Sequence, residues 1–246
     1  MSADPLAPLL ELPGVRPAAE AARAAVDRLL GHRVLRRRSA EVSAESALRG
    51  ARASAALDGA DYPLDKVRHG VDDPVLQGAL RVSAELGRLA GTWERAPGQV
   101  LARLHVLAAS GLVPADELGR PVADPEVSAR LAGLAGLVAG GTAAPAVLVA
   151  AVVHAELRVL VPFRTGSGVV ARAAARLTTV SRGLDPKALA VPEAGHLELS
   201  ADYDDALSGY AAGEPEGVAR WLRHCCEATE LGAREGLAIC AAVLRG

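Results

Sequence analysis

The most constraining feature of this sequence is a proline and glycine break between two apolar stretches, Val161-Pro-Phe-Arg-Thr-Gly-Ser-Gly-Val-Val-Ala-Arg172. The apolar segment before it, from Pro145 to about Leu160, predicts a buried helix. That helix must end near Pro162, because proline has no amide hydrogen and disfavours helical dihedral angles in the residue before it. The chain is therefore expected to leave the core here.

The break continues into a predicted second helix that begins at about Ser167 and carries Arg172 in its second turn. Gly166 and Gly168 can both adopt the positive φ angles that align successive amide groups. The free amides and partial positive charge at a helix start bind anions. The segment therefore predicts a loop suited to phosphate, with the Ser167 hydroxyl as a candidate helix cap.

The composition indicates one largely helical domain. The chain has 246 residues, of which 50% are hydrophobic and only 2% aromatic, so Leu, Val and Ala must form most of the core. Such an alanine-rich sequence favours closely packed helices. The net charge of −2 and the isoelectric point near 6.3 give no electrostatic reason to expect nucleic acid as a partner.

The loop resembles the signature of the Fic (Fido) family, whose members typically transfer AMP from ATP to a protein hydroxyl. The family's loop reads His-Pro-Phe-x-(Asp/Asn)-Gly-Asn-Gly-Arg-x-x-Arg, usually with another His seven residues upstream. His154 has the upstream spacing, and five further positions match in register: Pro162, Phe163, Gly166, Gly168 and Arg172. The resemblance implies an all-α, Fic/Fido-like single domain, with a short flap hairpin or loop supplied by residues 111–124.

Four chemically active positions of that signature differ here. Val161 stands where the family has its base and cannot accept a proton; loss of a positioned base costs a factor of roughly a hundred to ten thousand. Thr165 offers a neutral oxygen where Mg²⁺ prefers a carboxylate. Ser167 replaces the Asn, and Val169 supplies no charge where an Arg is expected. The resemblance therefore implies the scaffold without the usual chemistry.

A second segment, Ser54-Ala-Ala-Leu-Asp-Gly59, is similar to the inhibitory Ser/Thr-x-x-x-Glu-Gly/Asn motif of many Fic proteins. In that motif a carboxylate pairs with the last Arg of the signature, which here is Arg172. Asp58 would supply the carboxylate on a side chain one methylene shorter. The alternative interpretation is an ordinary helix end capped by a left-handed Gly59, and the sequence leaves both open.

These patterns give a candidate nucleotide or anion site and no catalytic residue. ATP or another phosphate compound is the expected ligand, and the resemblance does not support Mg²⁺ because Thr165 replaces the acid. The candidate binding residues are Gly166, Ser167, Gly168 and Arg172, with Ser54, Asp58 and Gly59 as inhibitory-like positions.

Two kinds of function remain open. The first is a pseudoenzyme that binds a nucleotide or anion, or acts as a regulatory protein through a protein partner or a homo-oligomer. The second is a divergent AMP transferase, for which Glu156 and Arg158 are the local polar candidates. No metal site is predicted, because His105 has no second ligand at metal spacing. His154 is expected to be a core histidine and not a replacement catalyst, since it lies two turns before the loop.

The predicted organisation has three parts: a leader and first helix over residues 1–38, a Fic-like domain over 39–235, and a helix end over 236–246. The inhibitory-like helix covers about 39–59, and residues 60–72 are expected to form a loop. The apolar stretch 131–153 is interrupted by glycines and a proline, so no membrane span is expected. Cys225, Cys226 and Cys240 are interpreted as buried thiols of a cytoplasmic protein.

Overall fold

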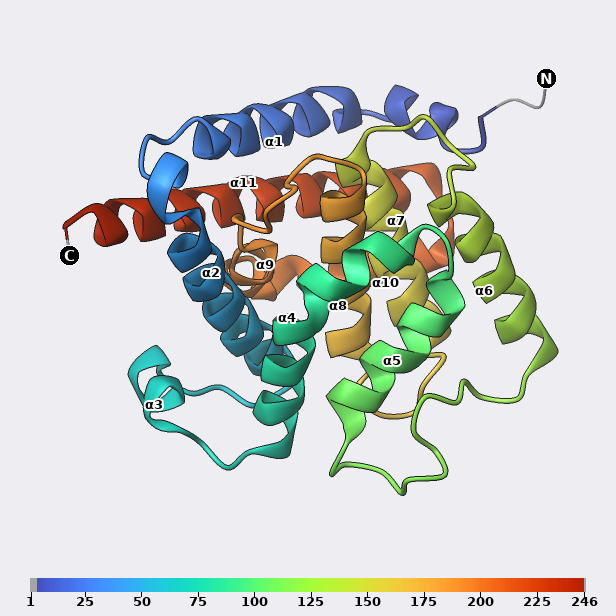
Figure 1. Cartoon of the computed structure of the whole chain (residues 1–246). Helices are drawn as coiled ribbons and strands as arrows, with labels where there is room; N and C mark the ends of the chain where they lie inside the picture. The colour runs from blue at the N-terminus through green and yellow to red at the C-terminus, as the bar shows by residue number, and fades with distance from the viewer. Residues whose placement is uncertain (1–3, 246) are drawn as a thin grey trace.

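The computed structural model describes residues 4–245, and within them the ordered elements are helices only. After a short 3-10 helix, η1, the chain forms eleven α-helices packed as one domain (Figure 1). The predicted all-α fold is confirmed. The helices are α1 (Val15–Leu30), α2 (Leu35–Leu57), α3 (Leu64–His69), α4 (Pro74–Trp93), α5 (Pro97–Ala109), α6 (Pro125–Val138), α7 (Ala146–Leu160), α8 (Ser167–Ser181), α9 (Pro192–Glu198), α10 (Ser200–Ala212) and α11 (Pro215–Arg245).

Helices α7 and α8, which flank the break at residues 161–166, form the centre of the domain. Most residues of both helices are buried, and for α7 its nearly continuous apolar sequence predicts this. Helix α8 packs against α7, α4, α5 and α2, while the 31-residue α11 lies along α1 and crosses α9 and α10 (Figure 1). The loop between α7 and α8 is therefore held at both ends by buried, closely packed helices.

Asp-Pro pairs fix where two of the helices begin. Asp73 precedes Pro74, and its Oδ1 accepts hydrogen bonds of 2.9 Å from the amides of Val75 and Leu76. Asp124 caps α6 in the same way. The carboxylate satisfies amides that have no partner within the helix, and proline suits the first helical position, where no amide hydrogen is needed.

The N-terminal segment is more ordered than its four prolines suggest, although residues 1–3 lie outside the described part. The predicted irregular leader contains η1 (Ala7–Glu11), and α1 begins two residues before Pro17. Asp4 explains part of this order, because its carboxylate accepts hydrogen bonds from the Thr142 hydroxyl and the Ala143 amide, at 2.6 and 2.7 Å. The leader is therefore tied to the turn before α7.

Three further segments differ from what the sequence predicted. The loop expected over residues 60–72 contains α3, so that expectation was wrong. Helix α2 begins at Leu35 and has a kink at Arg38, where φ is −122°, and α11 continues unbroken past residue 235 to Arg245. None of the helices within residues 4–245 is long and apolar enough to cross a membrane.

Candidate functional site

The base position of the signature lies at the exposed end of α7. Val161 terminates the helix in the left-handed conformation, with φ 44° and ψ 57°, and 45% of its surface is exposed. A β-branched side chain is disfavoured in this conformation by about 1 to 2 kcal/mol. The position is thus strained and apolar, and its side chain can neither accept nor donate a proton.

The turn into α8 differs from the predicted pair of left-handed glycines. Gly166 has φ 75° and is the residue before the helix, as expected. Gly168 instead belongs to the first turn of α8 and does not have a positive φ. The Ser167 hydroxyl does not cap the helix: it donates to the Phe163 carbonyl at 2.5 Å and accepts from the Phe163 amide at 3.3 Å. Ser167 therefore closes the loop internally, and its hydroxyl is already engaged.

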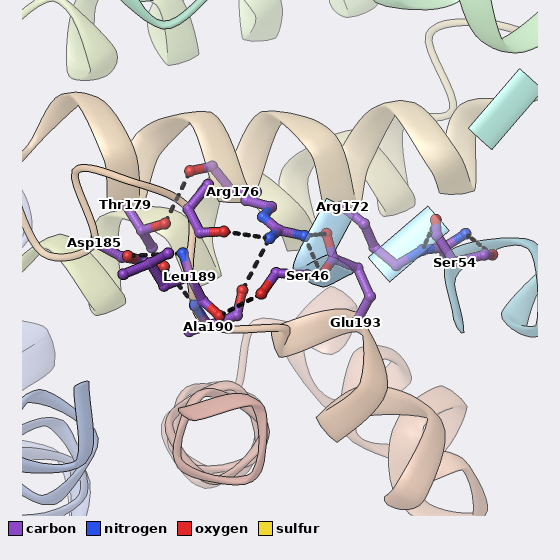
Figure 2. A network of polar contacts seen from close by, with 10 residues as sticks. Ser46, Ser54, Arg172, Arg176, Thr179, Asp185, Leu189, Ala190 and Glu193 are labelled. Carbon is purple, nitrogen blue, oxygen red and sulfur yellow. Dashed lines mark hydrogen bonds and ion pairs between the residues drawn. The ribbon is translucent and has the colours of Figure 1, made fainter. Parts of the chain in front are cut away.

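Arg172 extends from α8 to the end of α2, and its side chain is almost completely buried (Figure 2). Its Nε donates to the Ser54 hydroxyl at 2.8 Å, and its Nη2 donates to the Ser54 carbonyl and to Asp58 Oδ1, each at 2.8 Å. Burial disfavours the charged guanidinium, but the Asp58 carboxylate together with Tyr203 outweighs this, so the pKa of Arg172 lies above its ordinary value. The ion pair that the Ser54–Gly59 pattern predicts is present.

Asp58 also lies directly against the start of α8. A Cβ atom added at Gly168 would be 2.3 Å from Oδ1 and 2.6 Å from Oδ2 of Asp58, far inside contact distance. The reason for a glycine at this position is therefore the close approach of a carboxylate, not a positive φ. A negative group at a helix start is stabilised by the free amides and the helix dipole. Asp58 thus lies where an external anion would approach the helix and Arg172.

Gly59 caps the end of α2, as the interpretation of this segment as an ordinary helix end predicts. Its φ is 92°, and the Ala60 amide donates to the Ala55 carbonyl at 2.9 Å, which closes the end of α2. The two interpretations of the Ser54–Gly59 segment are therefore compatible. The left-handed glycine ends the helix, and this ending directs Asp58 toward α8.

A cleft of about 320 Å³ lies beside the loop and is lined on one side by Arg164 and Thr165. Its other side comes from the segment between α5 and α6, which contains one isolated β-bridge and adopts the loop form of the expected flap. The Val122 amide donates to the Pro162 carbonyl at 2.9 Å and joins this segment to the loop. The arrangement leaves a solvent-accessible recess with a mixed polar and apolar lining next to the signature.

His105 belongs to this site, although sequence reasoning treated it as an ordinary packed or surface histidine. Its ring stacks on Phe163 with centroids 4.1 Å apart, and its Nδ1 accepts from the Gly119 amide at 2.9 Å. Burial lowers the pKa of His105. The residue is packed, as expected, but it connects α5, the flap segment and the loop, which only their contact in three dimensions reveals.

The polar residues considered for an alternative mechanism are engaged elsewhere. Glu156 accepts from Arg130 at 2.7 Å and from the Tyr210 hydroxyl at 2.8 Å, so both its oxygens have partners. Arg158 lies 4.0 Å from Asp204, on the face of α7 toward α10. These two residues serve helix packing and surface charge pairing.

His154 is a core residue, as expected, since it is 1% exposed and its Nε2 is 2.8 Å from the Tyr203 hydroxyl. Sequence reasoning missed its neighbours. His196 and Cys225, 42 and 71 positions later in the chain, come within reach of His154 across α9 and α11. The three cysteines lack metal-ligand spacing among themselves, and no spacing rule connects residues as far apart in the chain as His154 and Cys225.

Comparison with solved structures settles the fold. No protein-family profile matches the sequence, and no curated protein matches it. A Fic family protein from Desulfovibrio desulfuricans G20 matches with a TM-score of 0.72 at 18% identity, covering 90% of this chain and 74% of that chain. Fic-1 from C. elegans matches with a TM-score of 0.74 at 16% identity, covering 94% and 74%. The chain has the Fic fold.

On this Fic fold, the two segments that carry the sequence resemblance lie against each other. The loop of residues 161–172 and the segment Ser54–Gly59 meet through Arg172, Asp58 and Gly168. At such low sequence identity the structural similarity establishes the architecture, and the chemistry of the site must be argued from its own residues.

Proposed function

We propose that this Fic-fold protein is catalytically inactive as an AMP transferase and binds a phosphate-bearing ligand, such as a nucleotide, at the start of α8. Asp58 competes with that ligand. The observation that carries the proposal is the position of the Asp58 carboxylate, which pairs with Arg172 and lies against Gly168 where a phosphate would approach. A ligand binds at this site by displacing the Asp58 carboxylate, so Asp58 regulates access to the site.

The inactivity follows from the side chains around the loop. Transfer of AMP to a hydroxyl needs a base for the proton and cations for the charge that develops on the phosphates. Val161 supplies no base, Thr165 has no carboxylate for Mg²⁺, and Val169 has no positive charge. These are three separate losses, and together they favour binding without turnover.

The anion-binding side of the site is the part that supports a ligand. The Arg172 guanidinium is held in place by the Ser54 hydroxyl and carbonyl, and its Nη2 is shared between Ser54 and Asp58. A phosphate that replaced Asp58 would find a guanidinium held by Ser54 and the free amides of a helix start. The neighbouring cleft of about 320 Å³ could hold the remainder of a small ligand.

The test is calorimetric titration of the full chain with ATP, ADP and inorganic phosphate, each with and without Mg²⁺. Asp58→Ala should bind more tightly than wild type, because the competing carboxylate is removed, and Arg172→Ala should not bind. Asp61→Ala is the matched control, since it removes the same charge from a carboxylate that pairs with Arg52 at the surface. Absence of binding in all folded variants, Asp58→Ala included, contradicts the proposal.

The rival function, a divergent transferase acting on a protein hydroxyl, is tested in the same samples. Incubation with ATP and Mg²⁺ should leave the intact mass of the chain, and of proteins added as acceptors, unchanged. A mass increase of one AMP on any of them would support the rival. If no nucleotide binds and no AMP is transferred, a function through a protein partner or a second copy of the chain takes the place of the proposal.

A further inference from the structure

A cluster of three potential metal ligands lies in the core, outside the loop site. His154 on α7, His196 on α9 and Cys225 on α11 each offer one ligand atom, and these atoms lie within 4.8 Å of one another. All three residues are at most 5% exposed. Two imidazoles and a thiol converging from three helices are an uncommon use of core positions, since apolar residues would fill them at lower desolvation cost.

One ring nitrogen of each imidazole is held by a neighbouring side chain. His154 Nε2 lies 2.8 Å from the Tyr203 hydroxyl, and His196 Nδ1 lies 3.1 Å from His224 Nε2. Metal-ligating histidines are held in this manner, with the second ring nitrogen bonded to a group that fixes the tautomer and orientation.

The three residues also line a common cavity of about 40 Å³ between α7, α8, α9 and α11. A space of this size accommodates one or two water molecules or a single ion with little rearrangement. The convergence of the three ligand atoms and the cavity are separate observations, and both place potential ligand groups around the same small volume.

We propose that His154, His196 and Cys225 bind a single thiophilic d¹⁰ metal ion, Zn²⁺ or Cu⁺, in the core of the domain. Zn–N and Zn–S distances of about 2.0 and 2.3 Å place ligand atoms roughly 3.5 Å apart, so the side chains move inward by about 1 Å on binding. Thiolate and imidazole ligands select zinc and cuprous ions over Mg²⁺ or Ca²⁺. A zinc ion would complete its coordination with a water molecule in the cavity.

Binding exchanges one proton for the metal. The Cys225 S–H bond breaks, its proton leaves to solvent, and the sulfur forms the bond to the ion, while the imidazoles bind as neutral ligands. The bound ion and thiolate carry a net charge of +1 for Zn²⁺ and zero for Cu⁺. Arg172 lines the same cavity, and its charge is compensated by Asp58, so the cation does not face an unpaired guanidinium.

The competing occupant is water. Among residues 4–245, Arg172 Nη1 and Arg176 Nε are buried and have no hydrogen-bond partner, and both residues line the cavity. Ordered water alone could satisfy these nitrogens. The experiment must therefore distinguish a thiolate-bound metal from a solvated polar cavity.

The full chain is purified, stripped of metal with a chelator under reducing conditions, and titrated with Zn²⁺, Cu⁺ and, as a spectroscopic probe, Co²⁺. We expect one ion per chain, release of a proton, and a rise in melting temperature of several degrees at a hundredfold excess over the dissociation constant. Co²⁺ should give a thiolate charge-transfer band and visible bands of tetrahedral intensity. The relative affinities for Zn²⁺ and Cu⁺ then identify the preferred ion.

Cys225→Ser should lose the charge-transfer band and weaken binding at least tenfold, and His196→Gln should weaken binding comparably. Cys226→Ser is the matched control: Cys226 is the adjacent, buried cysteine on α11, it is outside the cluster, and its substitution should leave the band unchanged. The band in the wild-type chain reports a thiolate ligand even if a variant fails to fold. Absence of stoichiometric binding by folded wild-type chain, or a band that persists in Cys225→Ser, overturns the proposal in favour of a water-filled cavity.

Discussion

Gly168→Ala tests whether Asp58 lies where the structure places it. The added Cβ would be 2.3 Å from Asp58 Oδ1, about 1 Å closer than ordinary contact, so the carboxylate must move away. A movement of this size extends the 2.8 Å contact with Arg172 Nη2 beyond hydrogen-bonding distance. The substitution therefore breaks the ion pair without removing either charge.

The magnitude follows from two opposing terms. Breaking a buried ion pair costs about 3 to 5 kcal/mol when one charge is left uncompensated. Here the cost is nearer 2 kcal/mol, because the Asp58 side chain is 21% exposed and Arg172 keeps its bonds to Ser54. Alanine in place of glycine within a helix returns about 0.5 to 1 kcal/mol. The net expectation is a loss of about 1 kcal/mol, or about 2 to 4 °C in melting temperature for a domain of this size.

The decisive assay is a double-mutant cycle measured by urea denaturation. In the Asp58→Ala background no carboxylate opposes the new methyl group, so Gly168→Ala should stabilise the chain by about 0.5 to 1 kcal/mol, which gives a coupling energy of about 2 kcal/mol. Gly87→Ala on α4 is the control, since nothing lies within 4 Å of its added Cβ, and it should give equal gains in both backgrounds. Equal effects of Gly168→Ala in the two backgrounds would refute the placement of Asp58.

Three further predictions concern the loop. Val161→Gly should raise the free energy of unfolding by about 1 kcal/mol, because glycine adopts the left-handed conformation without the strain of a β-branched side chain. Urea denaturation measures this change, and a lower free energy of unfolding would show that Val161 is unstrained. Val161→His should not restore AMP transfer, measured by intact mass, because Thr165 and Val169 still lack the carboxylate and the positive charge. The lowered pKa of His105 means that, below about pH 6.5, the unfolded chain takes up a proton that the folded chain does not, so stability should fall as the pH falls. His105→Asn, whose amide oxygen can accept from Gly119, should make the free energy of unfolding less dependent on pH between about 7 and 5; an unchanged slope would contradict this role.

The sequence was sufficient to predict the helical class and the helices on each side of the loop, and it offered Asp58 as one of two interpretations of the Ser54–Gly59 segment. These depend on local signals that are strong here: the proline after α7, the glycine before α8, and the spacing of Ser54, Asp58 and Gly59. The roles of individual loop residues were less predictable. A glycine required by a positive φ and a glycine required by a close contact look identical in sequence. The positive φ predicted for Gly168 was therefore wrong, and the close contact with Asp58 explains this glycine instead.

The remaining features depend on tertiary contacts between distant segments. The stacking of His105 on Phe163 joins positions 58 residues apart, and His154 and Cys225 meet across 71 residues. Ser167 was expected to cap a helix, but the tight loop brings the Phe163 backbone within reach of its hydroxyl first. Local propensity cannot anticipate such competition between partners, because it is decided by packing.

The affinity of the Asp58→Ala chain for ADP, relative to wild type, tests the central claim most directly. If the Asp58 carboxylate occupies a retained phosphate site, its removal should strengthen ADP binding at least about tenfold, equivalent to 1.4 kcal/mol, and Arg172→Ala should abolish the gain. If Asp58→Ala and wild type bind ADP equally, or neither binds it while both remain folded, Asp58 and Arg172 form a structural ion pair and the proposed ligand site does not exist.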